Sequence, residues 1–177
     1  MKDQVGFTAW FTGLPCCGKT TIAKKVYDIL KDKGYKVEHL DGDIVRKDLT
    51  SDLGFSKGDR EENLKRVTFV AKLLSRNDII VLATFVSPYK KRRKIIKKEV
   101  KNFLEIYVKC PVEVCIKRDV KGMYKKALAG EIKDFTGVDD PYEEPKDPDL
   151  VIYSDKETIK QSVEKVLKKL KEHGFIQ

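Results

Sequence analysis

Short apolar segments of the chain alternate with longer segments in which apolar residues return every three or four positions. The short segments predict strands, and residues 79–86, IIVLATFV, are apolar enough for a strand buried on both faces of a parallel sheet. The longer segments predict amphipathic helices. Strands are expected at residues 5–12, 36–40, 79–86, 103–108 and 150–153, and helices at 21–33, 59–76, from about 88, and at 158–171. The alternation predicts an α/β fold, a three-layer α/β/α sandwich around a five-stranded parallel sheet, with ligands beyond the carboxyl ends of the strands.

Residues 121–145 interrupt this alternation. They are rich in Gly, Asp and Pro and show only a brief helical pattern at 123–128. Loops of this length in compact domains are usually lids, binding loops or disordered segments. The mixture of aromatic, basic and acidic residues favours a lid that becomes ordered over a ligand. The alternative is a loose surface excursion.

The chain has 177 residues, which is the size of one domain, and no linker or repeat divides it. We therefore expect a single domain over residues 1–177. Met1 to Gln4 are polar where a signal peptide needs an apolar run, and no apolar segment approaches the roughly 20 residues that span a bilayer. These features predict a cytoplasmic protein that has no membrane partner.

The net charge is +9 at pH 7, and residues 90–94 read KKRRK, followed by Lys97 and Lys98. Such a run is typical of nucleic-acid binding, but basic residues round a cleft also concentrate small polyanionic substrates. We interpret the run as the solvated face of a helix, with Ile95, Ile96 and Val100 facing inward, and expect no stable nucleic-acid partner. A non-catalytic module that binds anions or nucleic acid is the alternative.

Four cysteines in a cytosolic chain are weak evidence for disulfides. Cys110 and Cys115 lack the spacing of a zinc site, and we interpret them as small buried hydrophobes. Cys16 and Cys17 lie beside a predicted helix N-terminus, where the pKa of a thiol can fall. One hypothesis is that oxidation there blocks nucleotide binding.

Residues 13–20, GLPCCGKT, match the Walker A pattern at each fixed position, between a predicted strand and a predicted helix. Glycines allow a tight turn whose N–H groups converge on phosphate oxygens, and the helix N-terminus favours the same anion. Lys19 is expected to reach the β and γ phosphates, and the Thr20 hydroxyl is expected to ligate Mg²⁺. The sequence therefore predicts binding of ATP with Mg²⁺.

Two carboxylates, Asp41 and Asp43, follow the second predicted strand. From that strand end they can face the phosphate loop, where one supports Mg²⁺ and the other orients a hydroxyl acceptor. Taken alone, Asp-Gly-Asp is also an ordinary turn. The downstream residues that change this interpretation are Arg46, Phe55, Arg60, Asn63 and Arg66, which offer guanidinium groups for an anion, an aromatic face for a base and an amide. This set predicts a site for an anionic nucleotide as acceptor.

At this point the chain resembles the adenylyl-sulfate kinases over nearly its whole length. The resemblance rests on GLPCCGKTT at 13–21, DGD at 41–43 with Arg46, DLGF at 52–55 with Arg60 and Asn63, VSPY at 86–89, RDVKGMY at 118–124, GEIKDFTG at 130–137 and DPYE at 140–143. It implies a P-loop kinase fold, transfer of phosphate from MgATP to the 3′-hydroxyl of adenylyl sulfate, and a homodimer. The competing interpretation within the fold is a small P-loop kinase that acts on a nucleoside, gluconate or shikimate.

The resemblance also implies roles for single residues. For ATP they are Gly13, Cys16, Cys17, Gly18, Lys19, Thr20 and Thr21, with Arg118 packed against the adenine. For adenylyl sulfate they are Asp43, Arg46, Arg60 and Asn63 as polar contacts, Phe55 and Phe135 on the two sides of the adenine, and Val86, Ser87, Lys121 and Thr136 round the pocket. Thr20 and Asp41 are the predicted metal ligands. Stacking one base on an aromatic ring contributes about 1 to 3 kcal/mol.

Ser87 matches a serine that is labelled a phosphoserine intermediate in this family, but the sequence places no histidine beside it to activate it. We favour direct in-line transfer, in which Asp41 accepts or orients the hydroxyl proton, Asp43 supports the metal and acceptor, and Lys19 balances charge on the moving phosphoryl group. Two departures from the family pattern, Pro15-Cys16-Cys17 in the Walker loop and Val120 before the lid, remove no group that the chemistry needs. The chain is too short for an attached sulfurylase-like domain.

Overall fold

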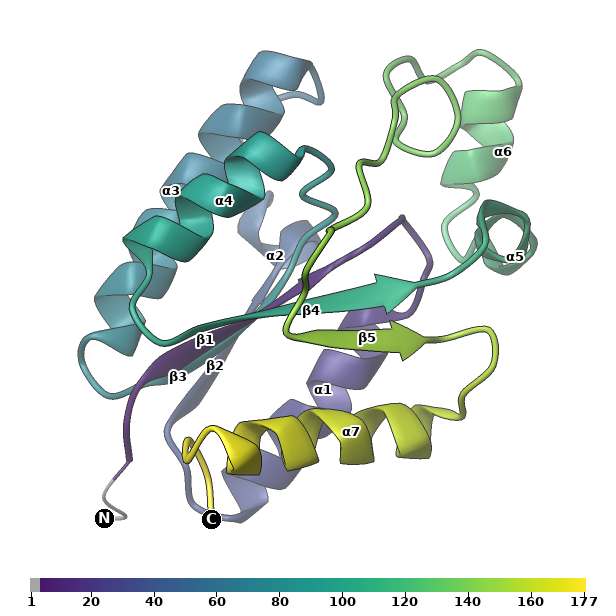
Figure 1. Cartoon of the computed structure of the whole chain (residues 1–177). Coiled ribbons are helices and arrows are strands. Elements are labelled where there is room, and N and C mark those ends of the chain that lie inside the picture. The colour runs from purple at the N-terminus through teal and green to yellow at the C-terminus, as the bar shows by residue number, and fades with distance from the viewer. Residues whose placement is uncertain (1–3) are drawn as a thin grey trace.

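The computed structural model describes residues 4–177 (Figure 1). Met1 to Asp3, part of the polar start discussed above, lie outside the described residues. Strands β1 (Phe7–Thr12), β2 (Val37–Asp41), β3 (Ile80–Thr84), β4 (Phe103–Lys109) and β5 (Leu150–Tyr153) form one parallel sheet in the order β2-β3-β1-β4-β5. The five predicted strands are confirmed, with ends that differ by at most two residues.

Strand β1 lies at the point where the direction of the chain across the sheet reverses. The chain places β2 and β3 on one side of β1, and then crosses to place β4 and β5 on the other side. In open parallel sheets, ligands bind beyond the carboxyl ends of the strands at this switch point. The loop that follows β1 therefore lies where the fold places a ligand site.

Two pairs of helices cover the sheet, so the predicted three layers are confirmed (Figure 1). Helices α1 (Lys19–Asp32) and α7 (Ile159–Glu172) pack on one face, and α3 (Lys57–Ser75) and α4 (Lys90–Glu99) pack on the other. Side chains of β1 alternate between the two cores: Phe7 and Phe11 join the α1 and α7 side, and Trp10 joins the α3 and α4 side. Buried apolar contact on both faces holds β1 in the centre of the sheet.

Three shorter helices lie near the carboxyl end of the sheet. Helix α6 (Met123–Leu128) coincides with the predicted helical stretch in the long loop. Helices α2 (Gly42–Val45) and α5 (Val112–Arg118) were not predicted, because four and seven residues are too few to show a helical period. The Asp41 carboxylate caps α2 by accepting a hydrogen bond from the Asp43 amide at 3.0 Å. The Asp-Gly-Asp sequence is therefore a strand-to-helix junction.

The basic run on α4 differs from the prediction. Ile96 and Val100 are buried as expected, and Lys91, Lys94, Lys97 and Lys98 are exposed. Arg92 and Arg93, however, are 8% and 4% exposed, so the prediction of a solvated face is wrong for these two residues. The cause for Arg93 is a buried ion pair with Glu105 of β4.

Cys110 and Cys115 were predicted to be small buried hydrophobes. Cys110 and Cys115 are free and buried, as predicted. Between residues 4 and 177, no helix combines the length and the apolar character that crossing a membrane requires.

Candidate active site

The Walker loop joins β1 to α1 and contains three residues with positive φ. These are Gly13 at 149°, Cys16 at 58° and Gly18 at 103°. A Cβ atom on Gly13 would lie 2.4 Å from the Val108 carbonyl oxygen, so the close contact between the loop and β4 requires glycine. Gly18 begins α1 without any side-chain cap, and the N–H groups of the first helical turn have no acceptor within the helix. The loop therefore presents free N–H donors to an anion.

Lys19 and Thr20 occupy the start of α1, with their polar groups at the loop. Lys19 is buried, and its Nζ donates to the carbonyl oxygens of Gly13 at 2.9 Å and Leu14 at 2.7 Å. Its ammonium group therefore lies inside the loop that would hold the phosphates. Thr20 Oγ1 donates to Asp41 Oδ2 at 2.8 Å, which joins the Walker loop to the end of β2. Thr21 is exposed in the same turn.

Asp41 is a buried carboxylate that accepts hydrogen bonds from three groups. Its Oδ2 accepts from the hydroxyls of Thr20 and Thr84, both at 2.8 Å, and its Oδ1 accepts from the Asp43 amide. Burial by itself would raise the pKa of Asp41, but these hydrogen bonds outweigh burial and hold that pKa below its ordinary value. The carboxylate is therefore ionised at neutral pH, although Asp41 is only 5% exposed.

Thr84 and His39 support Asp41 and were not predicted from the sequence. Thr84 Oγ1 gives its proton to Asp41, so it accepts at 3.1 Å from His39 Nε2, which must carry a proton. Burial lowers the pKa of His39, which favours the neutral imidazole. The feature that identifies Thr84 as a partner of Asp41 is the register of β2 with β3, which places the two residues opposite each other.

Asp43 contrasts with Asp41 because its side chain is 66% exposed. Its carboxylate forms an ion pair with Lys121, at the start of the predicted lid. Arg46 lies nearby on the same segment, where its guanidinium covers the Phe55 ring at 4.3 Å and donates to the Gly54 carbonyl oxygen. Phe55 as a residue is 56% exposed, so part of it is open for contact.

Arg60 and Asn63 project from the first half of α3. Arg60 pairs with Asp140 at 2.9 Å and also donates to Thr136 Oγ1, so it connects α3 to the predicted lid. Asn63 is 5% exposed, and its Oδ1 accepts from Thr50 at 2.8 Å. Arg60 therefore attaches the predicted lid to α3, a contact that the sequence did not reveal.

Ser87 is buried and belongs to a chain of hydrogen bonds. Its Oγ accepts from Trp10 Nε1 at 3.1 Å and donates to Thr12 Oγ1 at 2.9 Å. Thr12 donates to the Val86 carbonyl oxygen, so the Tyr142 hydroxyl must donate to Thr12. The Ser87 proton is thus directed to a neutral hydroxyl and not to a base, and this geometry favours a positioning role over a nucleophilic one.

The predicted lid is packed against the rest of the site. Phe135 contacts the buried Tyr124 edge to face, with ring centroids 5.0 Å apart. Asp140 accepts from the Tyr89 hydroxyl at 2.9 Å as well as from Arg60. Burial is the main reason why the pKa of Tyr89 is raised to about 12, and Asp140 adds to it. The segment is therefore fastened at Asp140.

Arg118 and Cys17 meet at the outer side of the Walker loop. Arg118 donates to the Ser154 carbonyl oxygen at 2.6 Å and to the Cys17 carbonyl oxygen at 3.3 Å. Arg118 thus holds the loop against the segment after β5. The Cys17 side chain is buried, and burial raises the pKa of its thiol, so the expectation of a lowered pKa is wrong for Cys17.

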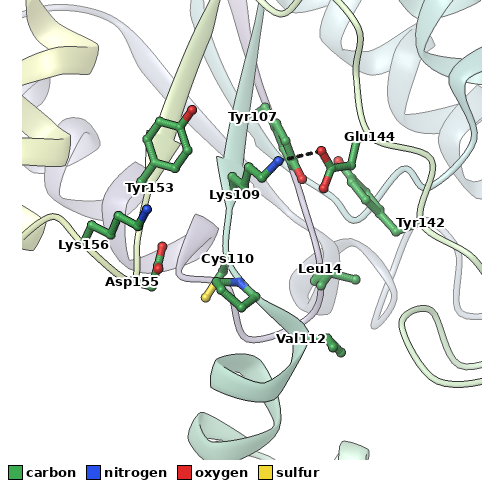
Figure 2. Close-up of a pocket in the computed structure, with 11 residues that line it drawn as sticks. Leu14, Tyr107, Lys109, Cys110, Val112, Tyr142, Glu144, Tyr153, Asp155 and Lys156 are labelled. Carbon is green, nitrogen blue, oxygen red and sulfur yellow. Dashed lines mark hydrogen bonds and ion pairs between the residues drawn. The ribbon is translucent and has the colours of Figure 1, made fainter.

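A pocket of about 380 Å³ lies beside this site, between the ends of β4 and β5 and the last residues of the predicted lid (Figure 2). Leu14 of the Walker loop borders it, and the ion pair of Lys109 with Glu144 spans it at 2.8 Å. Its lining is Leu14, Tyr107, Lys109, Cys110, Pro111, Val112, Tyr142, Glu144, Tyr153, Asp155 and Lys156. None of the residues predicted for catalysis or ligand binding is in this lining.

The comparisons with known proteins point to one family. The family model described as adenylylsulphate kinase matches residues 5–153. An adenylyl-sulfate kinase of Halothermothrix orenii is 56% identical over 176 residues, which are 99% of this chain and 95% of that protein.

Solved structures agree with the sequence comparison. The Mycobacterium tuberculosis APS kinase CysC in complex with AMPPNP and APS is similar with a TM-score of 0.91 and 40% identity, over 96% of this chain and 99% of that chain. The hexameric APS kinase from Thiobacillus denitrificans is similar with a TM-score of 0.75 and 32% identity, over 98% of this chain and 30% of that chain.

Proposed function

The chain belongs to the adenylylsulphate kinase family, and we propose that it transfers the γ-phosphate of MgATP to the 3′-hydroxyl of adenosine 5′-phosphosulfate. The products are ADP and 3′-phosphoadenosine 5′-phosphosulfate. The observation that carries the proposal is the hydrogen bond between Thr20 and Asp41, in a chain whose relatives are named for this reaction. It joins a phosphate-binding loop to the carboxylate pair beside Arg46 and Phe55.

Thr20 and Asp41 fit a magnesium site. Mg²⁺ prefers oxygen ligands, and the Thr20 hydroxyl and Asp41 carboxylate present two such oxygens 2.8 Å apart at the mouth of the Walker loop. Asp41 is also ionised at neutral pH for the reason given above. Bound Mg²⁺ would neutralise charge on the β and γ phosphate oxygens.

The two aspartates have different surroundings, and we assign them different parts. Three hydrogen bonds fix Asp41 in place, which suits a carboxylate that supports the metal and orients Thr20. The Asp43 carboxylate is exposed, and it pairs with an exposed lysine side chain, that of Lys121. Asp43 is therefore the better candidate to accept a hydrogen bond from the 3′-hydroxyl, in place of Asp41 as the sequence alone led us to expect.

Transfer is direct and in line in this proposal. The Lys19 ammonium group lies in the Walker loop, where it would balance charge on the transferred group as the bond to ADP breaks. The Ser87 hydroxyl is committed to Thr12, so Ser87 contributes to the shape of the acceptor pocket. No phosphorylated enzyme intermediate is needed.

The acceptor lies between α3 and the lid in this proposal. Phe55 offers an exposed ring from one side and Phe135 a partly buried ring from the lid, as the family resemblance implies for an adenine. Arg46, Arg60 and Asn63 then supply polar contacts, with Val86, Lys121 and Thr136 at the margin. Lys121, which pairs with Asp43, would move away when the acceptor hydroxyl binds to Asp43.

The test is ADP release from MgATP with adenylyl sulfate, compared with AMP, adenosine and shikimate as acceptors, and with identification of the 3′-phosphorylated product. Turnover confined to adenylyl sulfate is the expected result. Turnover with shikimate or adenosine instead would refute the acceptor. Binding of ATP without turnover on any of the four would refute kinase action on this class of acceptor.

We also propose that the chain acts as a homodimer in the cytoplasm, as expected from the family resemblance. One relative assembles as a hexamer, so the assembly of this chain requires its own measurement. Light scattering coupled to size-exclusion chromatography is the direct test. A mass near that of one chain, 20.3 kDa, would rule out the dimer.

A further inference from the structure

Arg93 is a charged side chain buried beneath the acceptor side of the site. It extends from α4, is 4% exposed, and pairs through Nε with Glu105 Oε1 of β4 at 2.9 Å. Burying a guanidinium is costly unless its charge and its N–H groups have partners. The partners of its two remaining nitrogens indicate what this residue does.

Those two nitrogens donate to main-chain oxygens of two different segments. Nη1 donates to the Ser87 carbonyl oxygen at 2.6 Å, and Nη2 donates to the Glu143 carbonyl oxygen at the end of the predicted lid. Ser87 has φ of 40°, an uncommon conformation for a residue with a side chain, so its position needs support from its surroundings. The rigid fork of an arginine sets the spacing of the two carbonyl groups.

Other contacts at the same place join the two segments directly. The Glu143 amide donates to the Pro88 carbonyl oxygen at 3.0 Å, and the Lys90 amide donates to the Glu143 carboxylate at 2.7 Å. The Arg93 guanidinium also lies 5.5 Å from the centre of the Tyr142 ring, whose hydroxyl reaches Thr12. The end of the lid is thus attached to the loop at residues 86–90, with Arg93 at the centre of the junction.

We propose that Arg93 is a positioning residue that fixes the distance between the acceptor loop at Ser87 and the closing end of the lid. The proposal rests on the proposed function, in which Ser87 and the lid form opposite walls of the acceptor pocket. One guanidinium holds both walls, so its loss would widen the pocket for adenylyl sulfate and leave the Walker loop unchanged. Arg93 touches neither substrate in this arrangement.

Arg92 provides a matched control. It is the preceding residue of α4 and is also buried, at 8% exposure, but it faces Glu61 of α3 at 3.9 Å. Its Nε and Nη2 have no hydrogen-bond partner among the described residues. Substitution of Arg92 by lysine therefore removes a buried guanidinium from the same helix and leaves the junction at Ser87 and Glu143 intact.

The experiment compares Arg93→Lys with Arg92→Lys in the full chain. Lysine keeps the charge beside Glu105 but cannot reach both carbonyl oxygens. We expect Arg93→Lys to raise KM for adenylyl sulfate about tenfold or more, with KM for ATP and kcat changed by less than about threefold, and Arg92→Lys to leave all three within about twofold. An unchanged KM for adenylyl sulfate in Arg93→Lys, or an equal rise in both variants, would overturn the proposal.

A second readout does not depend on turnover. Hydrogen exchange of the amides at residues 140–146, measured without ligand, should be about tenfold faster in Arg93→Lys than in wild type and unchanged in Arg92→Lys. If wild type fails to act on adenylyl sulfate, the proposed function falls, and this exchange still decides whether Arg93 holds the junction. If Arg93→Lys does not fold, Arg93→Gln, which cannot donate to both carbonyl oxygens, replaces it, and wild-type exchange at residues 140–146 in that variant would overturn the proposal.

Discussion

Replacement of Asp41 by asparagine tests the centre of the site, because it keeps the size of the side chain and removes its charge. Three donors point at this carboxylate: the hydroxyls of Thr20 and Thr84 and the amide of Asp43. An asparagine offers one oxygen and one NH₂ group in their place. The NH₂ group of the asparagine must therefore face a hydrogen-bond donor, unless the threonine hydroxyls rotate to accept from it.

The expected effect follows from these contacts. A hydrogen bond to a charged group contributes about 1.5 to 3 kcal/mol, and rotation of the two threonine hydroxyls recovers part of what is lost. We expect Asp41→Asn to lower the free energy of unfolding by about 2 to 4 kcal/mol at pH 7. Loss of the charge beside Thr20 should also lower kcat by about 10² to 10³ or more.

Asp43→Asn is the matched control for stability. The Asp43 side chain is 66% exposed and its partner Lys121 is 56% exposed, and exposed ion pairs contribute only about 0 to 1 kcal/mol. We expect this variant to unfold with a free energy within about 0.5 kcal/mol of wild type and still to lose kcat by about 10² or more, as befits a group that orients the acceptor. The two variants thus separate structural support from contact with the acceptor.

The pH dependence gives a third comparison. The pKa of Asp41 is lowered by folding, so its contribution to stability is complete above its ordinary pKa of about 3.9 and is lost as pH falls through the lower value in the folded protein. The difference in free energy of unfolding between wild type and Asp41→Asn should therefore become smaller below about pH 4. Urea unfolding followed by circular dichroism at pH 7 and at successively lower pH measures it. Equal stability of the two proteins at pH 7, or a difference that does not change with pH, would refute this account of Asp41.

Three further predictions concern the Walker loop and the lid. Gly13→Ala should lower the affinity for ATP by at least about tenfold in calorimetry, because its Cβ would lie 2.4 Å from the Val108 carbonyl oxygen. Cys17 should react with iodoacetamide at least about ten times more slowly than Cys16 in the native protein, as read by mass spectrometry, because burial protects its thiol and raises the pKa. Asp140→Asn should speed tryptic cleavage within residues 121–133 by about tenfold, because it removes the ionic partner of Arg60 at the lid.

Each of these has a control or a contrary outcome in the same chain. Gly34 also has positive φ, at 81°, but within residues 4–177 a Cβ added to Gly34 would meet no atom inside 4 Å, so Gly34→Ala should lose stability and keep its affinity for ATP. Wild-type affinity in Gly13→Ala would contradict the close contact with β4. Equal labelling of Cys16 and Cys17 would contradict the burial of Cys17, and unchanged cleavage in Asp140→Asn would show that the lid is held elsewhere.

The features that the sequence predicted are those in which local pattern and chemistry agree. The Walker loop needs glycine where φ is positive, and Gly13 and Gly18 occupy such positions in the structure. The five strands are apolar runs separated by segments with helical periodicity, so the hydrophobic pattern is enough to predict them. Short helices such as Gly42–Val45 have no period to detect, and they were missed for that reason.

The support of Asp41 depends on strand register, which a single sequence does not specify. Thr84 and Asp41 are separated by 43 positions and meet because β2 pairs with β3 in one particular alignment. A shift of one residue would turn the Thr84 hydroxyl to the other face of the sheet. The sequence could identify the carboxylate but not the threonine that holds it.

The basic run on α4 shows that a cluster of charges in the sequence does not reveal which of its residues are exposed. Neighbouring letters in KKRRK differ in burial because the elements that face them differ: Arg93 meets Glu105 of β4 and Arg92 meets Glu61 of α3, while Lys91 and Lys94 face solvent. The part of the run that an external polyanion would contact is therefore smaller than the sequence implied. This weakens the nucleic-acid interpretation on physical grounds, since Arg93 is 4% exposed and each of its three nitrogens donates within the protein, so its guanidinium is not accessible to a phosphate backbone. The positive charge of Arg93 is used inside the protein, where residues 86–90 meet the end of the predicted lid.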